Sequence, residues 1–101
     1  MIKIRIGSNE RNYSDTDPGW INQQINRRRH DGQLVCAQVV IDTTGVNMLL
    51  STPACAGGGG SRSPNLRESA IFDLWTKRRL NSNDFNGGQL IAFLKQLPEF
   101  L

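Results

Sequence analysis

The feature that most constrains this chain is a stretch of small and turn-forming residues at 56–64 that contains four consecutive glycines. Glycine loses the most conformational freedom on folding, and the proline that ends the stretch lacks a backbone donor, so no helix or strand is expected there. We predict a flexible loop at 56–64. This loop divides the chain into a first part rich in strand-forming residues and a last part with helical periodicity.

Three segments before the loop are predicted to be strands. Isoleucine alternates with basic residues at 2–7, which is the period of a half-buried strand. The segment 34–41 is apolar on both alternating faces, which favours a central strand covered on both sides. Turn residues at 42–45 separate it from a second β-rich run at 46–51. The two runs are therefore predicted to form a hairpin.

Three further segments are predicted to be helices. An Asp-Pro pair is typical of an N-cap followed by proline in the first turn, and it predicts a helix at 18–29 with a narrow apolar stripe. An asparagine followed three residues later by a glutamate resembles a capping box and predicts a helix at about 66–79. Apolar residues at spacings of three and four, up to Leu97, predict a last helix that ends before Pro98. The last two helices should form an antiparallel hairpin because their connection is short.

The order of these elements is β-α-β-β-α-α, which predicts an α+β fold. A small three-stranded sheet is expected to be packed by one helix and by the C-terminal helical hairpin. The length of 101 residues fits one domain with one modest core, so residues 1–101 are expected to form a single domain.

Composition and cysteine usage predict where the protein resides. Hydrophobic residues make up 38% and charged residues 21%, a mixture too apolar for a disordered chain and too polar for a membrane span. The amino terminus lacks the apolar block of a signal peptide. Cys36 and Cys55 are too few for a disulfide scaffold, so they are predicted to be thiols, with a single disulfide as the alternative. We therefore expect a cytoplasmic protein without membrane contact.

The glycine-rich loop carries the one pattern that resembles a catalytic device. Cys55 before it, Arg62 near its end and a helix after it resemble the loop of the cysteine-based phosphatases. That resemblance implies a thiolate that attacks phosphorus while backbone N–H groups and the arginine hold the phosphate oxygens. Six residues separate Cys55 from Arg62 where the family has five, and the extra residue misplaces the guanidinium. We therefore predict that the protein is not an enzyme, and cysteine-dependent phosphatase chemistry is the least favoured alternative.

A weaker form of the same idea is anion binding without catalysis. The candidate residues are Gly58, Gly59, Gly60 and Arg62. No metal is predicted, because His30 is the only histidine and its spacing from the two cysteines matches no zinc pattern. No cofactor is predicted either, since the glycines have neither the lysine of a Walker loop nor the spacing of a dinucleotide-binding loop.

The basic residues suggest nucleic-acid binding as an alternative function. The net charge is +3, and nine of the twelve basic residues are arginine, clustered at 27–29 and 77–79. Amide and guanidinium groups on the exposed side of helix 18–29 are suited to contact phosphates and base edges. The arginine-rich first helix is the predicted contact surface for that function.

The preferred hypothesis is a small non-catalytic binding or regulatory module that acts through protein–protein contacts. The apolar stripe of helix 18–29 is predicted to be too narrow to bury both Trp20 and its arginine-rich flank, and two large apolar residues follow Pro98 at the chain end. The partner is expected to be another protein or a second copy in a homodimer. The predicted contact residues are Trp20, Arg27, Arg28, Arg29, Phe100 and Leu101.

Overall fold

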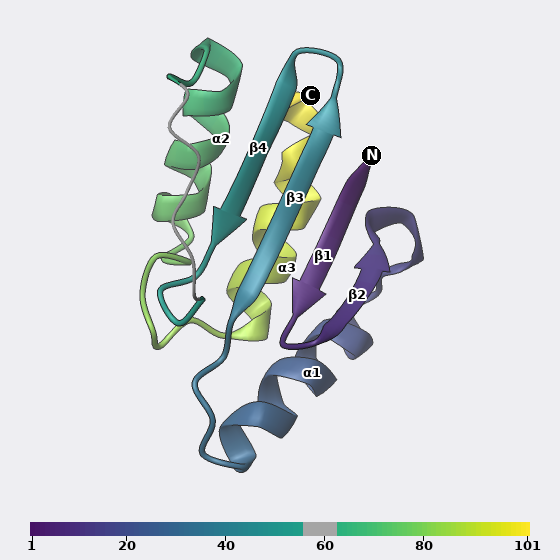
Figure 1. Ribbon diagram of the computed structural model, residues 1–101, viewed down its shortest axis with the longest axis vertical. Coiled ribbons are helices and arrows are strands. Elements are labelled where there is room, and N and C mark those ends of the chain that lie inside the picture. The colour runs from purple at the N-terminus through teal and green to yellow at the C-terminus, as the bar shows by residue number, and fades with distance from the viewer. Residues whose placement is uncertain (56–62) are drawn as a thin grey trace.

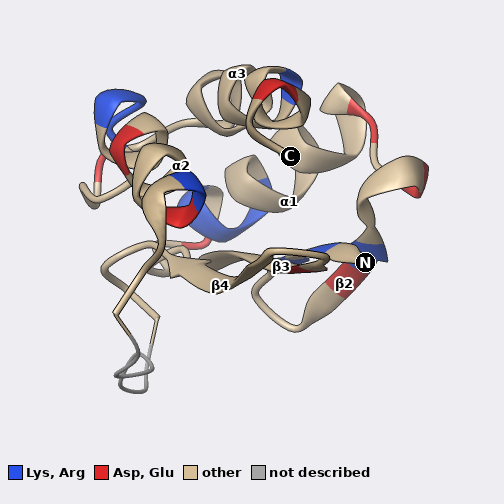
Figure 2. Ribbon diagram, turned by 90° about the horizontal axis from the view of Figure 1, so that it is seen from above, with Lys and Arg blue, Asp and Glu red and all other residues tan. Residues whose placement is uncertain are grey.

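The computed structural model describes residues 1–55 and 63–101, which form a layer of helices on one face of an antiparallel sheet (Figures 1 and 2). The described elements, in chain order, are the strands β1 (Ile2–Ile6) and β2 (Asn9–Asn12), the 3-10 helix η1 (Tyr13–Asp15), the helix α1 (Pro18–His30), the strands β3 (Ala37–Thr43) and β4 (Val46–Ser51), the helices α2 (Leu66–Lys77) and α3 (Gly87–Gln96), and the 3-10 helix η2 (Leu97–Phe100). The strand order is β2-β1-β3-β4, and each neighbouring pair is antiparallel. The α+β class and the β3–β4 hairpin are thus confirmed.

The sheet has a fourth strand, β2, so the prediction of three strands is wrong. All of the side chains of β2 are exposed, and the strand therefore lacks the apolar alternation that marks a half-buried strand. Its inward-facing side chains contact α1 instead. The Arg11 guanidinium lies 4.8 Å from the centre of the Trp20 ring, and Asn9 Nδ2 donates to Gln24 Oε1 at 2.6 Å. Polar contacts with a helix hold this strand, where the sequence predicts only a turn-rich connection.

β3 buries only one of its faces, so the expectation of a strand covered on both sides is wrong. Val39 is buried, whereas Gln38 and Val40 on the opposite face are only partly buried. Antiparallel pairing places Val39 beside Ile4 of β1 and Leu50 of β4, so the three strands share one apolar face. All described helices lie on that face (Figure 2). We call the opposite face, which carries Gln38 and Val40, the open face.

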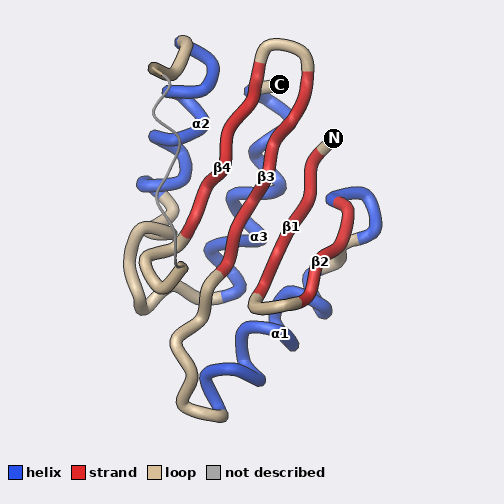
Figure 3. Tube along the Cα trace, in the orientation of Figure 1, coloured by secondary structure: helices blue, strands red, loops and turns tan. Residues whose placement is uncertain are grey.

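The helices fill the core through direct contacts with one another. Trp75 of α2 and Phe93 of α3 meet edge to face with ring centres 5.1 Å apart. These two helices run in opposite directions, as the predicted hairpin requires (Figure 3). On its other side α3 approaches α1 so closely that a Cβ at Gly87 would lie 1.9 Å from Asn22 Oδ1. α3 therefore contacts both of the other helices.

The predicted capping box begins α2 and also ties that helix to the sheet. Glu68 Oε1 accepts from the Asn65 N–H at 3.0 Å, and Asn65 Oδ1 accepts from the Glu68 N–H at 2.8 Å. Glu68 Oε2 accepts from the backbone N–H of Asn47 in β4 at 2.8 Å. The helix ends at Lys77 instead of residue 79, and Arg79 adopts a φ of 61°.

The end of the chain folds back onto the core. Pro98 lies in the first turn of η2, and Phe100 packs against the buried cluster, while Leu101 is 40% exposed. Among residues 1–55 and 63–101, no helix has both the length and the apolar character that crossing a membrane requires.

Cys36 and Cys55 form a disulfide, so the prediction of two thiols is wrong. Gln38 and Ser51 are the last register pair of the β3–β4 hairpin. The hairpin therefore brings the start of β3 next to the turn that follows β4, and the two Cα atoms lie 4.6 Å apart. The partnership arises from strand pairing, because the two cysteines are 19 residues apart in the chain.

The core assignment predicts the cost of truncating Leu74, which is 6% exposed. Leu74→Ala should lower the free energy of unfolding by about 2–5 kcal/mol, because it removes buried methyl groups and leaves a cavity. Urea denaturation measures this loss. Leu66→Ala on the same helix is the control, since Leu66 is exposed and its truncation should change stability by less than about 0.5 kcal/mol. A loss below about 1 kcal/mol for Leu74→Ala would contradict the packing described here.

Candidate anion-binding surface

The two arginine clusters, 50 residues apart in the sequence, meet at the connection between α2 and α3. Arg29 of α1 donates through Nη2 to the carbonyl oxygen of Asn83 at 3.4 Å. Arg79, which follows α2, lies with Nη2 3.8 Å from Asp84 Oδ2. The last turn of α1 and this connection lie in the lower part of Figure 1. We call this surface the basic end, and it comprises Arg27, Arg29, Lys77, Arg78, Arg79 and the connection 80–86.

Arg28 is occupied inside the protein. Its Nη1 donates to the carbonyl oxygen of Gln24 at 2.9 Å and to Gln24 Oε1 at 3.0 Å. Its guanidinium packs on the β1–β2 turn, where a Cβ at Gly7 would lie 2.0 Å from Arg28 Nε. Gly7 also has a φ of 63°, which disfavours any other residue there. Arg28 thus locks α1 to the sheet and has little freedom to bind a partner.

The Arg29 side chain makes polar and ring contacts with other described residues, whereas the Arg27 side chain makes none of these. The Arg29 guanidinium lies 4.9 Å from the centre of the buried Phe85 ring, which places it in cation–π range and fixes its position. Arg27 is exposed, and within residues 1–55 and 63–101 it has neither a hydrogen-bond nor an ion-pair partner through its side chain. Arg27 is therefore available to an external anion from the last turn of α1, whereas Arg29 in the same turn is held at the α2–α3 connection.

Basic residues at the end of α2 line a shallow hollow of about 320 Å³. Arg78 is held in place because its Nε donates to Gln96 Oε1 of α3 at 2.8 Å. Lys77 is exposed, and its ammonium group has no partner in the part of the chain that the structure describes. The lining residues are Lys77, Arg78, Arg79, Asn86, Gly88, Gln89 and Ala92. The hollow thus combines three cations with the amide groups that begin α3.

Asp84 is the acidic residue that lies among these cations. A hydrogen bond from the Ser82 hydroxyl is the main reason that the pKa of the Asp84 carboxyl lies below its ordinary value, and the charges of Arg79 and Arg29 lower it further. Asp84 is therefore ionised at neutral pH. Its carboxylate lies 3.8 Å from the Arg79 guanidinium, so an anionic ligand has to compete with it there.

Trp20 is 8% exposed, so the expectation that it offers an exposed contact surface is wrong. Arg11 of β2 covers the ring, and β2 is the strand that the sequence does not predict. Phe100 and Leu101 lie at the carboxyl end, far from the last turn of α1 (Figure 1). The structure therefore does not bring the predicted protein-contact residues together on one surface.

The predicted anion-binding residues of the glycine-rich loop, Gly58, Gly59, Gly60 and Arg62, lie outside the described residues, as does most of the predicted loop at 56–64. Cys55 at its start is bonded to Cys36, so in this state its sulfur is not the thiolate that phosphatase chemistry requires.

A second hollow of about 210 Å³ lies between the start of α1 and α3, and it is mainly apolar. The Tyr13 hydroxyl closes one side by donating to the Leu94 carbonyl oxygen at 2.5 Å. The lining residues are Tyr13, Thr16, Asp17, Pro18, Ile21, Ile91, Leu94 and Lys95. This hollow shares no residue with the basic end.

Both arginine clusters stand out in the sequence, whereas the residues that join them do not. Asn83, Asp84 and Phe85 follow α2 in a polar, turn-like segment that reads as a helix break. The one signal in the sequence is Asp84, an acidic residue five positions after Arg79. Such a residue is typical of a charged turn, and it does not indicate that Arg29 lies nearby.

No protein-family model matches the chain, and no curated protein or solved structure is significantly similar to it.

Ser82→Ala should raise the pKa of the Asp84 carboxyl toward its ordinary value, because the Ser82 hydroxyl is the main cause of the lowering. The wild-type carboxyl should take up its proton at a lower pH than the variant does. An NMR pH titration of the Asp84 side-chain carboxyl measures both midpoints. Ser14→Ala, a change at an exposed serine in η1, should leave the midpoint unchanged. Equal midpoints in wild type and Ser82→Ala would contradict this hydrogen bond.

Proposed function

We propose that this protein is a non-catalytic binding domain that holds the phosphate backbone of a nucleic acid at its basic end. The observation that carries the proposal is that Arg29 at the end of α1 and Arg79 after α2 contact neighbouring residues of one connection, Asn83 and Asp84. Arginine forks match the geometry of phosphate oxygens, and a polyanion offers several of them at regular spacing.

The basic end combines fixed and free cations, which suits phosphate contacts. Arg29 and Arg78 are held by Phe85 and Gln96, so they lose little freedom on binding. Arg27 and Lys77 are exposed and reach outward from the ends of α1 and α2. Phosphate contacts from such groups orient a strand on the protein without reading its bases.

The protein-contact hypothesis drawn from the sequence has lost its main support, since it required an exposed Trp20. A partner protein at the basic end would have to be acidic. A glutamate-rich peptide is therefore the appropriate competing ligand.

A cytoplasmic location, which the sequence predicts, also remains a proposal. A reducing compartment keeps cysteines as thiols, so the redox state of Cys36 and Cys55 in cells tests it. Complete alkylation of both residues in cell lysate prepared under acid quench supports a cytoplasmic location, and a protected disulfide contradicts it.

Binding to a labelled 20-base-pair DNA duplex and to a single-stranded RNA of equal length, followed by fluorescence anisotropy across a salt series, tests the function. The logarithm of the association constant should fall linearly with the logarithm of the salt concentration. Arg27→Gln with Lys77→Gln should reduce that slope by about 0.9 for each lost contact to duplex phosphate. The matched control is Arg67→Gln with Lys95→Gln, which removes the same charges outside the basic end and should change the slope less.

Three outcomes would overturn the proposal. These are a salt-independent affinity, equal slopes for the two double variants, and tighter binding of a glutamate-rich peptide than of either nucleic acid at the same salt concentration. The last outcome would assign the surface to an acidic protein.

Asp84→Asn should tighten nucleic-acid binding by roughly two- to fivefold, because it removes a carboxylate that competes with phosphate for Arg79 and Arg29. The same anisotropy assay at fixed salt measures the change. Asp42→Asn, on β3 outside the basic end, makes the same change in net charge and should have a smaller effect. If the two variants gain equally, net charge explains the result and Asp84 has no special position.

A further inference from the structure

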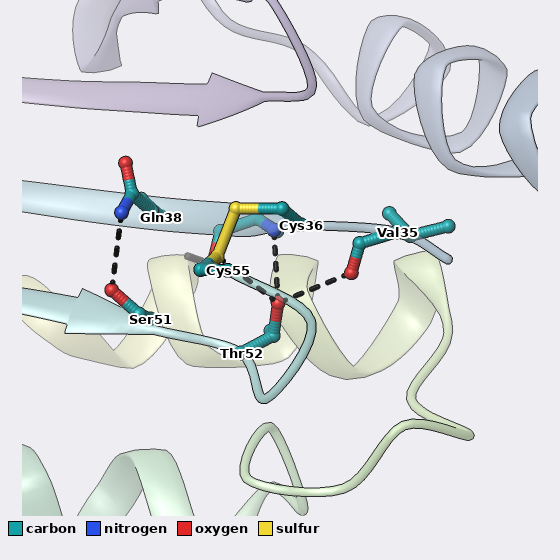
Figure 4. Close-up of a disulfide and its surroundings, with 7 residues drawn as sticks. Val35, Cys36, Gln38, Ser51, Thr52 and Cys55 are labelled. Atoms are coloured by element: carbon teal, nitrogen blue, oxygen red, sulfur yellow. Dashed lines mark hydrogen bonds between the residues drawn. A yellow bond between two sulfur atoms is a disulfide. The ribbon is translucent and has the colours of Figure 1, made fainter. Parts of the chain in front are cut away.

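The disulfide between Cys36 and Cys55 lies on the open face, just beyond the last paired residues of β3 and β4 (Figure 4). Cys36 continues the outward alternation of β3 two residues before Gln38. Both cysteines are partly exposed, and no helix of the described residues covers this face (Figure 2). As far as the described residues are concerned, a small thiol can therefore approach the bond from the open face without any opening of the core.

The two sulfur atoms have different surroundings. Cys55 Sγ lies 3.7 Å from Thr52 Oγ1 and 3.6 Å from the carbonyl oxygen of Ala37. The hydroxyl can donate to a departing thiolate, and the carbonyl can accept from the thiol that forms when this thiolate is protonated. Cys36 Sγ has no hydrogen-bond partner within residues 1–55 and 63–101. Exchange is faster when the leaving sulfur is the better stabilised one, so Cys55 is the favoured leaving group and Cys36 the favoured target.

The end of the hairpin does not depend on the disulfide. The Thr52 N–H donates to the Ala37 carbonyl oxygen at 3.0 Å, and the Ala37 N–H donates to Thr52 Oγ1 at 2.9 Å. Thr52 Oγ1 also lies 3.3 Å from the carbonyl oxygen of Val35, and its single proton can turn from that carbonyl to the Cys55 sulfur without breaking the other two bonds. Thr52 is buried, so water competes poorly for these bonds. Opening the disulfide therefore releases Cys55 from β3 while β3 and β4 stay paired.

We propose that Cys36 is a site of reversible modification by a low-molecular-weight thiol of the glutathione class. The thiolate of the small molecule attacks Cys36 Sγ, a new sulfur–sulfur bond forms, and the bond between Cys36 and Cys55 breaks. Its electron pair goes to Cys55 Sγ, which takes up the proton that the attacking thiol gave to water. The sulfur of the small molecule is oxidised and that of Cys55 is reduced. In the reverse reaction, the Cys55 thiolate attacks Cys36 Sγ and expels the small thiol.

Peptide mapping of the exchange product tests this site. The oxidised protein is incubated with reduced glutathione at neutral pH, quenched in acid, and its free thiols are blocked with N-ethylmaleimide before digestion and mass spectrometry. Glutathione should be found on Cys36 and the maleimide on Cys55, with an excess of roughly fivefold or more over the reverse arrangement. The circular dichroism spectrum should not change during the reaction.

Three results would overturn the proposal. They are equal or reversed labelling of the two cysteines, no adduct at glutathione concentrations that open an exposed disulfide in a reference peptide, and loss of the β-sheet signal as the adduct forms.

Variants at Thr52 test the reason for the preference. Thr52→Val removes the hydroxyl and should reduce both the rate of exchange and the excess of adduct on Cys36, whereas Thr52→Ser keeps a hydroxyl and should preserve both. Ser51→Ala, next to it on the exposed side of β4, is the control and should behave like wild type. Wild-type rate and labelling in a folded Thr52→Val variant would show that the hydroxyl does not direct the exchange. The labelling ratio of the wild-type protein decides the proposal even if Thr52→Val does not fold.

Discussion

Antiparallel pairing places Ile4, Val39 and Leu50 side by side on one face of the sheet, and the described helices have to cover that face. Residues on the other face need no such cover, because they alternate with the buried set and remain partly solvated. This division places the helix ends and their arginines together on one side. It also leaves the Cys36–Cys55 disulfide on the side that no described helix covers. The two proposed sites therefore lie in different environments because of one packing constraint.

Close contacts between backbone and side chains determine which arginines hold the fold together and which are left to bind a ligand. α1 is held against the sheet where the Arg28 guanidinium packs on Gly7, and against α3 where Asn22 meets Gly87. The φ of 63° favours glycine at position 7, and at both positions an added Cβ would force the neighbouring side chain to move. With α1 fixed in this way, Arg29 reaches the α2–α3 connection. The placement of Arg27 and Arg29 at the end of α1 therefore depends on Arg28, which is occupied inside the protein.

Much of the fold could be predicted because its signals are local. The alternating isoleucines, the hairpin turn and the capping box at Asn65 each act within a few residues, and their elements are present. β2 was missed because its side chains bind Trp20 and Gln24 of α1, which lie outside any local pattern. The disulfide depends on the register of the hairpin: Gln38 pairs with Ser51, so residue 36 lies opposite residue 53, close to Cys55, and the predicted turn at 42–45 does not fix that register. Both arginine clusters are visible in the sequence, but their meeting is not, because the contact of Arg29 with Asn83 depends on how α1 packs against α3.

The chemistry of the basic end also limits what it can recognise. Its fixed guanidinium groups lie over Phe85 or bind Gln96, so their planes are already set before a ligand arrives. Base edges are read by side chains that enter a groove, usually from a helix or a strand that fits it. Here the cations come from two helix ends and the connection between α2 and α3, a shape that follows a backbone more readily than it enters a groove. Affinity at this surface should therefore depend on phosphate spacing and salt, with little dependence on base sequence.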